Sequence, residues 1–588
     1  MAGSSGKAFD FKLFKRLLAH TNKYRLTFYF VAFAAIAMSV LGVLTPHLLE
    51  AAIDKAILPK DWDGLVFYIS LMIIVLFAEV IFQFGFIFYA NWLGQNVIRD
   101  IRVKLFNLML SFKMKYFDKS AVGRLTTRAV NDIETIASIF SQGLFMIISD
   151  LLKMLVIAGV LLYKSWEMAL IVFTILPFLL YATRVFQRAM KSAFEDVRNQ
   201  VANLNSFVQE RITGMKIVQV FAREATEYKA FKEINEQHKK AWIKTVWYNS
   251  IFFPIAEMSS SIAIGLVVWY GGLNATQNGE ITLGIVTAFI QYAQMLFRPL
   301  RQIADKFNTL QMGMVAANRV FKILDTRSHI ANNGLIELNQ TTGLIEFENV
   351  RFGYNEDEEV IKGISFTVPP GQTIALVGAT GAGKSTIINL LSRFYEINNG
   401  DILIDNVSVK EYTLLSLRDH IAVVLQDVFL FAETIFKNIT LGDDTITEED
   451  VINAAKEIGV HKFIASLPGG YNYNVKERGS MLSSGQRQLI AFLRAYVSKP
   501  SILVLDEATS SVDSYSEEMI QNATDKITKG RTSIVIAHRL ATIKKADQIL
   551  VMDAGKIVEK GTHKELLRKQ SGFYKNLYEV QFMAEEAI

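Results

Sequence analysis

The chain of 588 residues contains no cysteine. This absence excludes disulfide bonds, thiolate metal sites and cysteine nucleophiles, although it does not fix the compartment. No secretory signal is expected either, since the first apolar run, near 26–45, is longer than a signal-peptide core and predicts a true membrane span. Basic residues are scarce in the connection after this run, which holds only Lys55 and Lys60.

Apolar residues, by contrast, make up 51% of the chain, which favours a membrane protein. The part through Asp325 holds 35 Lys and Arg against 23 Asp and Glu, whereas the remainder holds 27 against 34. A basic half beside apolar runs indicates a membrane surface rather than nucleic acid. Runs long enough to span a bilayer, about 20 residues each, occur near 26–45, 65–90, 144–163, 168–183, 251–272 and 283–300.

The distribution of basic residues predicts the orientation of these six spans. Lys and Arg gather between the second and third spans and between the fourth and fifth, whereas only Lys164 follows the third and none follows the fifth. By the positive-inside rule, both termini and the two long connections are cytoplasmic. Apolar residues at three- and four-residue spacings predict that the helices continue into these connections. Residues 113–118 and 213–218, near their turning points, are candidates for contact with the nucleotide domain.

A few polar residues fall inside the spans. Glu79 and Gln83 lie one helical turn apart in the second span, and Glu257 lies in the fifth. A carboxylate inside a membrane is by default a functional hypothesis, and the alternative is a structural pair with a neighbouring helix or with water. Asp150 and Lys153, three residues apart, are expected to pair with each other.

A glycine-rich loop follows the strand-like run Thr373–Val377 and precedes a helical pattern. Its order, G-x-x-x-x-G-K-S, is that of a phosphate-binding loop. Glycines let backbone N–H groups approach phosphate, Lys384 can reach the β- and γ-phosphates, and the Ser385 hydroxyl can ligate Mg²⁺. The alternative is a glycine-rich turn in another α/β domain. The residues predicted to bind ATP or GTP are Gly378, Ala379, Thr380, Gly381, Ala382, Gly383, Lys384, Ser385 and Thr386.

A second apolar run, 501–505, has the composition of a buried parallel strand and ends in two carboxylates. Asp506 at the strand end can hold Mg²⁺ through water, whereas Glu507 can orient and deprotonate the attacking water. This pair predicts nucleotide hydrolysis as well as binding.

The order of these motifs resembles that of the ATP-binding cassette (ABC) exporters, specifically a half-transporter with one membrane domain fused to one cassette. The resemblance covers the whole chain and is strongest from Tyr354 to His538. It implies that Tyr354 stacks on adenine, that Gln426 reaches Mg²⁺ or the attacking water, and that His538 contacts the γ-phosphate. The implied fold is an N-terminal all-α transmembrane domain of six helices (1–325), a linker (326–342) and an α/β P-loop NTPase cassette (343–588).

The signature motif departs from the family pattern. Residues 482–486 read Leu-Ser-Ser-Gly-Gln where the family usually has Leu-Ser-Gly-Gly-Gln, so Ser484 replaces the first glycine. The resemblance implies that this motif opens a helix that faces ATP on the other cassette. Serine suits a helix start, but its Cβ crowds a close backbone approach. The residues implied to contact that nucleotide are Ser483, Ser484, Gly485 and Gln486.

The resemblance implies an ATPase that uses ATP and Mg²⁺ to export lipid-like or amphipathic, drug-like substrates. One cassette cannot bring its own phosphate loop and signature motif to the same nucleotide. A second half-transporter is therefore expected, in a homodimer or in a heterodimer whose drifted signature motif covers the weaker site. The expected location is the cell membrane, with the cassette in the cytoplasm. An ATP-gated channel or regulator on the same frame is the alternative, whereas the six spans exclude a soluble cassette ATPase linked to nucleic acid.

Overall fold

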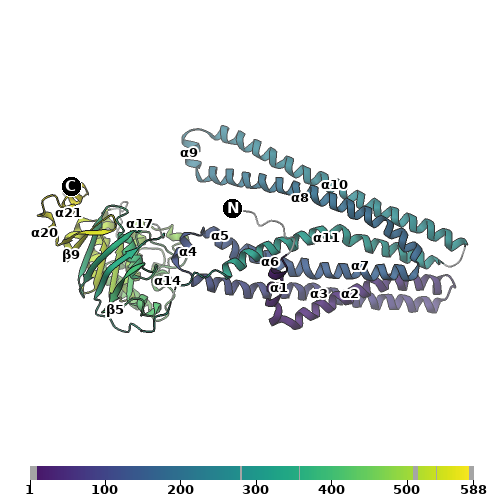
Figure 1. Cartoon of the computed structure of the whole chain (residues 1–588), viewed down its shortest axis with the longest axis horizontal. Helices are drawn as coiled ribbons and strands as arrows, with labels where there is room; N and C mark the ends of the chain where they lie inside the picture. The colour runs from purple at the N-terminus through teal and green to yellow at the C-terminus, as the bar shows by residue number, and fades with distance from the viewer. Residues whose placement is uncertain are drawn as a thin grey trace. The chain divides into compact units, whose positions relative to one another are not determined.

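The computed structural model describes residues 10–277, 281–330, 332–355, 358–506, 514–537 and 539–581. The chain forms two compact units (Figure 1). Residues 1–110 and 122–326 make the helical unit, whereas residues 111–121 and 327–588 make the cassette unit, which contains the β-sheets. The short segment 111–121 thus belongs with the cassette, although the sequence places it between two membrane spans.

Long helices dominate the helical unit because the apolar spans run on into polar helical segments. Helices α8 and α10 pack along each other and are joined through the short helix α9 (Figure 1), which confirms that helices continue beyond the spans. The helices are α1 (Phe11–Ala19), α2 (Arg25–Ala52), α3 (Trp62–Leu110), α5 (Val122–Thr127), α6 (Ile133–Ser138), α7 (Phe145–Lys164), α8 (Trp166–Thr213), α9 (Met215–Val220), α10 (Glu224–Gln277) and α11 (Leu283–Leu324). A 3-10 turn, η1 (His20–Tyr24), and π-helical turns η2 (Ile53–Ile57), η3 (Arg128–Asp132) and η4 (Ile139–Leu144) join them.

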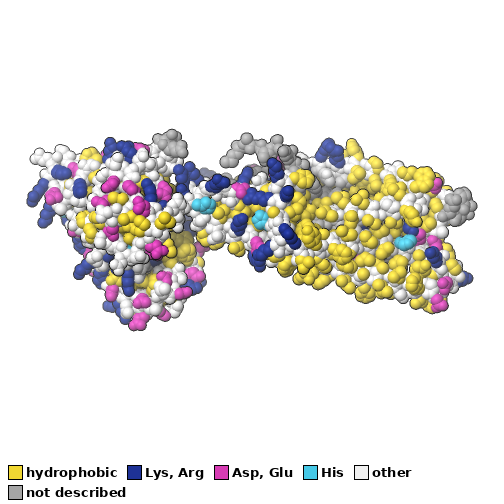
Figure 2. Space-filling model, turned by 60° about the horizontal axis from the view of Figure 1, so that its bottom comes forward, with side chains coloured by type: hydrophobic (Ala, Val, Ile, Leu, Met, Phe, Trp, Pro, Cys, Tyr) yellow, Lys and Arg dark blue, Asp and Glu magenta, His cyan; other side chains and the backbone are white. Residues whose placement is uncertain are grey.

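Five helical stretches of the described residues are long and apolar enough to cross a membrane: Phe11–Ile57, Trp62–Leu110, Val122–Lys164, Trp166–Thr213 and Glu224–Ala275. Each contains one predicted span. The sixth predicted span, 283–300, forms the first part of α11, where Phe289, Tyr292 and Phe297 are fully buried among the helices. Apolar side chains cover much of the surface of this unit (Figure 2), as expected for helices that face lipid rather than water.

Polar contacts fasten the helices of this unit to one another. The buried Tyr292 hydroxyl on α11 donates to the Val43 carbonyl of α2 at 2.9 Å. At the other end of α11, the Arg16 guanidinium of α1 donates to the Asp325 carboxylate at 2.6 and 2.7 Å. The same guanidinium lies 4.2 Å from the centre of the Phe321 ring. The amphipathic N-terminal helix is therefore docked onto α11 by both charge and ring contacts.

Two sheets form the centre of the cassette unit. The larger sheet has the order β10-β9-β3-β8-β7-β6, in which β9, β3, β8, β7 and β6 are parallel. Its strands are β3 (Thr373–Gly378), β6 (Ile421–Val424), β7 (Ile502–Asp506), β8 (Thr532–Ile536), β9 (Gln548–Asp553) and β10 (Lys556–Gly561). The smaller, antiparallel sheet contains β2 (Ile361–Val368), β1 (Ile345–Phe352), β4 (Asn399–Ile404) and β5 (Val407–Ser408), in that order. Because strands β3, β6, β7 and β8 are parallel, their carboxyl ends lie at one edge.

Helices cover the larger sheet and bury its apolar strands. Every residue of β7 and β8 is buried, as the continuous apolar runs predict for parallel strands. The helices of the cassette unit are α4 (Met114–Asp118), α12 (Lys384–Leu391), α13 (Leu414–Asp419), α14 (Ile435–Thr440), α15 (Glu448–Ile458), α16 (His461–Ala465), α17 (Ser484–Val497), α18 (Ser514–Thr528), α19 (Leu540–Lys545), α20 (His563–Leu567) and α21 (Phe573–Gln581). Two 3-10 turns, η5 (Gly470–Asn472) and η6 (Glu477–Gly479), lie between α16 and α17. This architecture confirms the predicted order of an all-α membrane domain followed by an α/β cassette.

Segment 111–121 is held to the start of the cassette chain by backbone and side-chain contacts. The Lys113 N–H donates to the Ser328 carbonyl at 2.7 Å, and Phe112 forms a β-bridge with His329. The Ser111 hydroxyl and His329 Nδ1 are 2.9 Å apart. These contacts reach residues 328 and 329 of the predicted linker. The Tyr395 hydroxyl of the cassette also donates to the Asp118 carboxylate, so the candidate contact at 113–118 does touch the nucleotide-binding part of the chain. The second candidate, 213–218, belongs to the helical unit, where Ile217 is 65% exposed.

Candidate nucleotide-binding site

The predicted nucleotide-binding residues gather at the carboxyl ends of the parallel strands. The phosphate loop follows β3, Asp506 ends β7, and Gln426 lies two residues beyond β6. Val424 of β6 pairs with Leu505 of β7, so these two strands end at the same level. Ligands of open α/β sheets bind at this edge because helix starts and loops converge there. The topology thus brings three separate motifs to one place.

Two glycines shape the phosphate loop because a side chain at either position would overlap its neighbours. A Cβ on Gly378, whose φ is 154°, would lie 2.2 Å from the Met552 carbonyl oxygen of the adjacent strand. Gly383 has a φ of 99°, and a Cβ there would lie 2.8 Å from Ile361 Cδ1. The loop therefore turns tightly between β3 and α12, and its N–H groups are available for phosphate.

Lys384 lies inside the curve of the phosphate loop and is only 8% exposed. Its ammonium group donates to the carbonyl of Gly378 at 2.7 Å and to that of Ala379 at 3.0 Å. Burial lowers the pKa of Lys384, and the nearby Asp506 carboxylate opposes this effect. A phosphate group at the loop would give this buried cation an anionic partner.

Ser385 and Asp506 meet across 121 residues of sequence. The Ser385 hydroxyl donates to Asp506 Oδ2 at 3.1 Å, and Asp506 is 8% exposed. Mg²⁺ in nucleotide sites prefers oxygen ligands from one or two protein groups, with water and phosphate completing its shell. A hydroxyl and a carboxylate in contact beside a phosphate loop fit that preference.

Tyr354, expected to stack on adenine, is half-buried beside the phosphate-loop helix. Its hydroxyl lies 3.3 Å from Thr386 Oγ1 and accepts a hydrogen bond of 3.3 Å from Asn389 Nδ2. Its ring meets Phe352 edge-on at 4.9 Å and Tyr395 edge-on at 5.0 Å. Four of the residues around Tyr354 thus fix its ring.

Of three further predicted residues, the structure describes only one. Gln426 is exposed in the loop after β6. Glu507, which directly follows the end of β7, and His538, which follows shortly after β8, lie outside the described residues. Their catalytic roles remain predictions based on sequence.

The signature motif forms the start of α17. Ser483 is the N-cap, and its hydroxyl accepts from the Gln486 N–H at 3.2 Å while Gln486 Oε1 accepts from the Ser483 N–H at 3.0 Å. This reciprocal capping box fixes the first turn. Ser484, the residue that departs from the family pattern, is the first residue of the helix and is exposed, whereas Gly485 is buried.

The predicted pair of Asp150 and Lys153 within the third span is wrong. Asp150 does not pair with Lys153; it forms an ion pair with Lys306 of α11. The Lys153 and Glu79 side chains instead both approach Gly42 of α2. A Cβ added to Gly42 would lie 2.9 Å from Lys153 Nζ and 3.2 Å from Glu79 Oε1. The prediction failed because spacing along α7 identifies neighbours on that helix but cannot reveal a cation on another helix.

One aromatic neighbour of the site is not marked by any local sequence signal. Tyr395 follows α12 and contacts Tyr354, although no motif marks it.

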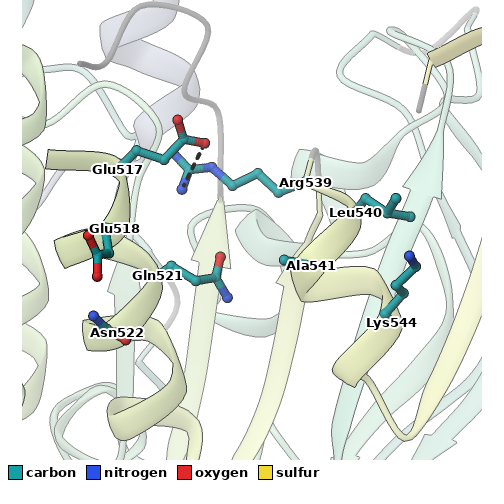
Figure 3. Close-up of a pocket in the computed structure, with 8 residues that line it drawn as sticks. All are labelled: Glu517, Glu518, Gln521, Asn522, Arg539, Leu540, Ala541 and Lys544. Carbon is teal, nitrogen blue, oxygen red and sulfur yellow. Dashed lines mark ion pairs between the residues drawn. The ribbon is translucent and has the colours of Figure 1, made fainter. Parts of the chain in front are cut away.

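A separate cavity of about 480 Å³ lies between α18 and α19 (Figure 3). There the Arg539 guanidinium approaches the Glu517 carboxylate at 3.6 Å. Among the predicted site residues that the structure describes, none lines this cavity.

The fold and site define a P-loop ATPase joined to a membrane domain. Residues 28–300 match the family described as the ABC transporter transmembrane region, and residues 361–510 match the family described as ABC transporter. The chain belongs to the ABC transporter family and couples ATP hydrolysis to transport.

Several related proteins match most of the chain. An uncharacterized ABC transporter ATP-binding protein of Bacillus subtilis is 35% identical over 98% of this chain and 96% of its own length. A probable multidrug resistance ABC transporter ATP-binding/permease protein of the same organism is 36% identical over 88% of this chain and 77% of its own. An ATP-dependent lipid A-core flippase of Syntrophus aciditrophicus is 33% identical over 98% and 95%, respectively. These relatives support an exporter with both parts on one chain.

Proposed function

We propose that this transporter moves lipid-like or amphipathic, drug-like compounds outward across the cell membrane as a dimer of half-transporters. Relatives named as lipid A-core flippases and as a multidrug resistance protein support this substrate class. The approach of Glu79 and Lys153 to Gly42 adds support, because charged groups within spans can meet a polar head group. The basic connections between spans support a cytoplasmic cassette.

The observation that carries the proposal is the convergence of Lys384, Ser385 and Asp506 at one sheet edge, with Tyr354 beside the phosphate-loop helix, in a chain that also has membrane spans. Tyr354 would stack on adenine, and Lys384 with the loop N–H groups would hold the β- and γ-phosphates. Ser385 and Asp506 would hold Mg²⁺, which neutralises phosphate charge when bound.

Hydrolysis is proposed to proceed by direct attack of water on the γ-phosphorus. Glu507 takes a proton from the water as its oxygen bonds to phosphorus. The bond to the β–γ bridging oxygen breaks at the same time, which leaves ADP and phosphate. Gln426 would orient the water or reach Mg²⁺, and His538 would contact the γ-phosphate.

The second half-transporter supplies the signature helix for each nucleotide. The capping box of α17 is consistent with a homodimer, because Ser484 keeps its backbone N–H at a regular helix start. A heterodimer would instead place Ser484 over a weaker site on the partner. A homodimer should hydrolyse ATP strongly when purified alone, and Ser484→Gly should change its turnover less than about two-fold. Weak activity alone that rises when a partner chain is added would identify the heterodimer.

Reconstituted liposomes test the transport function. Lipids and cationic dyes are added to the purified protein in liposomes, and a transported compound should stimulate ATP hydrolysis. The same compound should accumulate in inverted vesicles only when ATP is hydrolysed. An ATP-gated channel would instead let the compound equilibrate without accumulation, and that result would refute the exporter.

A further inference from the structure

Tyr395 occupies the turn that follows the phosphate-loop helix α12 and contacts two parts of the cassette unit at once. Its ring meets the Tyr354 ring edge-on at 5.0 Å with an interplanar angle of 89°. Its hydroxyl donates to the Asp118 carboxylate at the end of α4. Burial and this hydrogen bond raise the pKa of Tyr395, so the hydroxyl keeps its proton at neutral pH. One side chain therefore joins the predicted base-stacking ring to the segment between two membrane spans.

The turn that carries Tyr395 is fixed by two arginines. The guanidinium of Arg393, which is 4% exposed, donates to the Val409 carbonyl at 2.9 Å. Arg418 donates to the Ser392 carbonyl at 3.2 Å and to the Arg393 carbonyl at 3.0 Å. Because hydrogen bonds to charged donors are stronger than neutral ones, this turn has little freedom to absorb a displacement of Tyr395.

On the nucleotide side, Tyr395 is connected to the phosphate-loop helix through Tyr354. The hydroxyl of Tyr354 lies 3.3 Å from Thr386 Oγ1 and 3.3 Å from Asn389 Nδ2. Thr386 is buried in the first turn of α12, two residues after Lys384. A change in the angle of the Tyr354 ring on binding a base would thus act on its edge contact with Tyr395.

On the other side, Asp118 belongs to the segment 111–121 of the cassette unit. The segment 111–121 is bonded to residues 328 and 329 at its beginning, through Lys113 and Phe112. Asp118 lies at its far end, where α4 stops. The Tyr395–Asp118 hydrogen bond therefore ties the end of α4 to the turn after the phosphate-loop helix.

We propose that Tyr395 is a positioning residue that transmits the state of the base-stacking Tyr354 to α4 through Asp118. Nucleotide binding would then change the position of α4 through contacts that begin at the base rather than at the γ-phosphate. This inference rests on the proposed nucleotide site around Tyr354, but it does not depend on the substrate or the direction of transport.

A spin label on α4 tests the proposal in the full-length protein. The chain has no native cysteine, and Met114, the first residue of α4, is 47% exposed. Met114→Cys therefore provides one labelling site, and ATP added without Mg²⁺ binds without turnover. Label mobility reports the state of α4, and a fluorescent ATP analogue reports affinity separately.

Three substitutions separate transmission from binding. Tyr395→Phe removes the hydroxyl but keeps the ring, so ATP affinity should stay within about two-fold while the ATP-dependent change in mobility falls by more than half. Asp118→Ala should have the same effect, and the double variant should add nothing further. Tyr395→Leu also removes the ring pair, which should weaken ATP binding about 2- to 10-fold.

A matched control uses another tyrosine of the cassette that donates to a carboxylate. The Tyr496 hydroxyl donates to Glu457 at 2.7 Å, so Tyr496→Phe removes an equivalent hydrogen bond away from α4. This variant should keep the full ATP-dependent change. Asp118→Asn, which keeps an acceptor oxygen, should retain more of the change than Asp118→Ala.

Several results would overturn the proposal. One is an unchanged label response in Tyr395→Phe, and another is a loss of ATP affinity in that variant as large as in Tyr395→Leu. A wild-type label that fails to respond to bound ATP would also refute it. A responsive label in a protein that neither hydrolyses ATP nor transports would refute the proposed function but leave this inference standing.

Discussion

Removing Lys306 should destabilise the helical unit, because its ammonium group neutralises Asp150 within the third predicted span. The two side chains are 17% and 22% exposed, so each is mostly shielded from solvent. Lys306→Met keeps much of the side-chain volume and removes only the charge. The carboxylate of Asp150 then stays among apolar helices without its cation.

The charge, rather than the lost hydrogen bond, decides the size of the effect. Hydrogen bonds between membrane helices average about 0.6 kcal/mol. An uncompensated charge in a span costs about 2.5–3.5 kcal/mol, and breaking a buried pair costs about 3–5 kcal/mol. Because both side chains keep some exposure, we expect the lower end of that range, about 3 kcal/mol. At about 2–4 °C for each kcal/mol, the melting temperature should fall by about 6–12 °C.

Thermal unfolding in detergent micelles measures this change. Lys322→Met, on an exposed position of the same helix, is the matched control and should shift the melting temperature by less than about 2 °C. The double variant Asp150→Leu with Lys306→Met should recover most of the loss, because it removes both charges. If the double variant were as unstable as Lys306→Met, or if Lys306→Met matched the control, the reasoning from an unpaired charge would be refuted.

Three further predictions concern the cassette and are checked on the purified protein. Glu507→Gln should bind ATP normally but lose nearly all turnover, whereas Lys384→Ala should weaken ATP binding itself. Normal ATP hydrolysis by Glu507→Gln would contradict the role assigned to Glu507. Normal ATP affinity of Lys384→Ala, measured by equilibrium binding, would contradict the role assigned to Lys384. Gly378→Ala should abolish ATP binding because its Cβ would overlap the Met552 carbonyl oxygen at 2.2 Å, and wild-type affinity would show that β3 and β9 can separate. Burial acts to raise the pKa of Asp405, but hydrogen bonds from Thr342, Thr341 and Leu344 outweigh it and hold the pKa below the usual value. The ionised carboxylate therefore stabilises the fold above its usual pKa, and this stabilisation is lost as pH falls through the lowered pKa of the folded protein. Asp405→Asn should lower the melting temperature at pH 7, and the difference from the wild type should shrink in acid. A difference in melting temperature that does not depend on pH would refute the assignment.

Much of the protein was determined by local sequence. The phosphate loop could be read from residues 378–386 because its glycines, lysine and serine serve one chemical task at fixed spacing. The spans could be read because a bilayer requires about 20 apolar residues in a row, whatever else the chain does. The start of α17 was also local, since a capping box needs only Ser483 and Gln486 three residues apart.

The tertiary structure decided which residues from distant parts of the chain meet. Asp150 pairs with Lys306 rather than with Lys153, three residues away, because the packing of α7 against α11 brings the two charges together. Tyr395 and Asp118 are separated by 277 residues and carry no motif, so only the fold places the hydroxyl on the carboxylate. Local spacing fixes chemistry that one segment performs alone, whereas contacts between segments depend on helix rotation and strand order, which a single sequence does not encode in any short pattern.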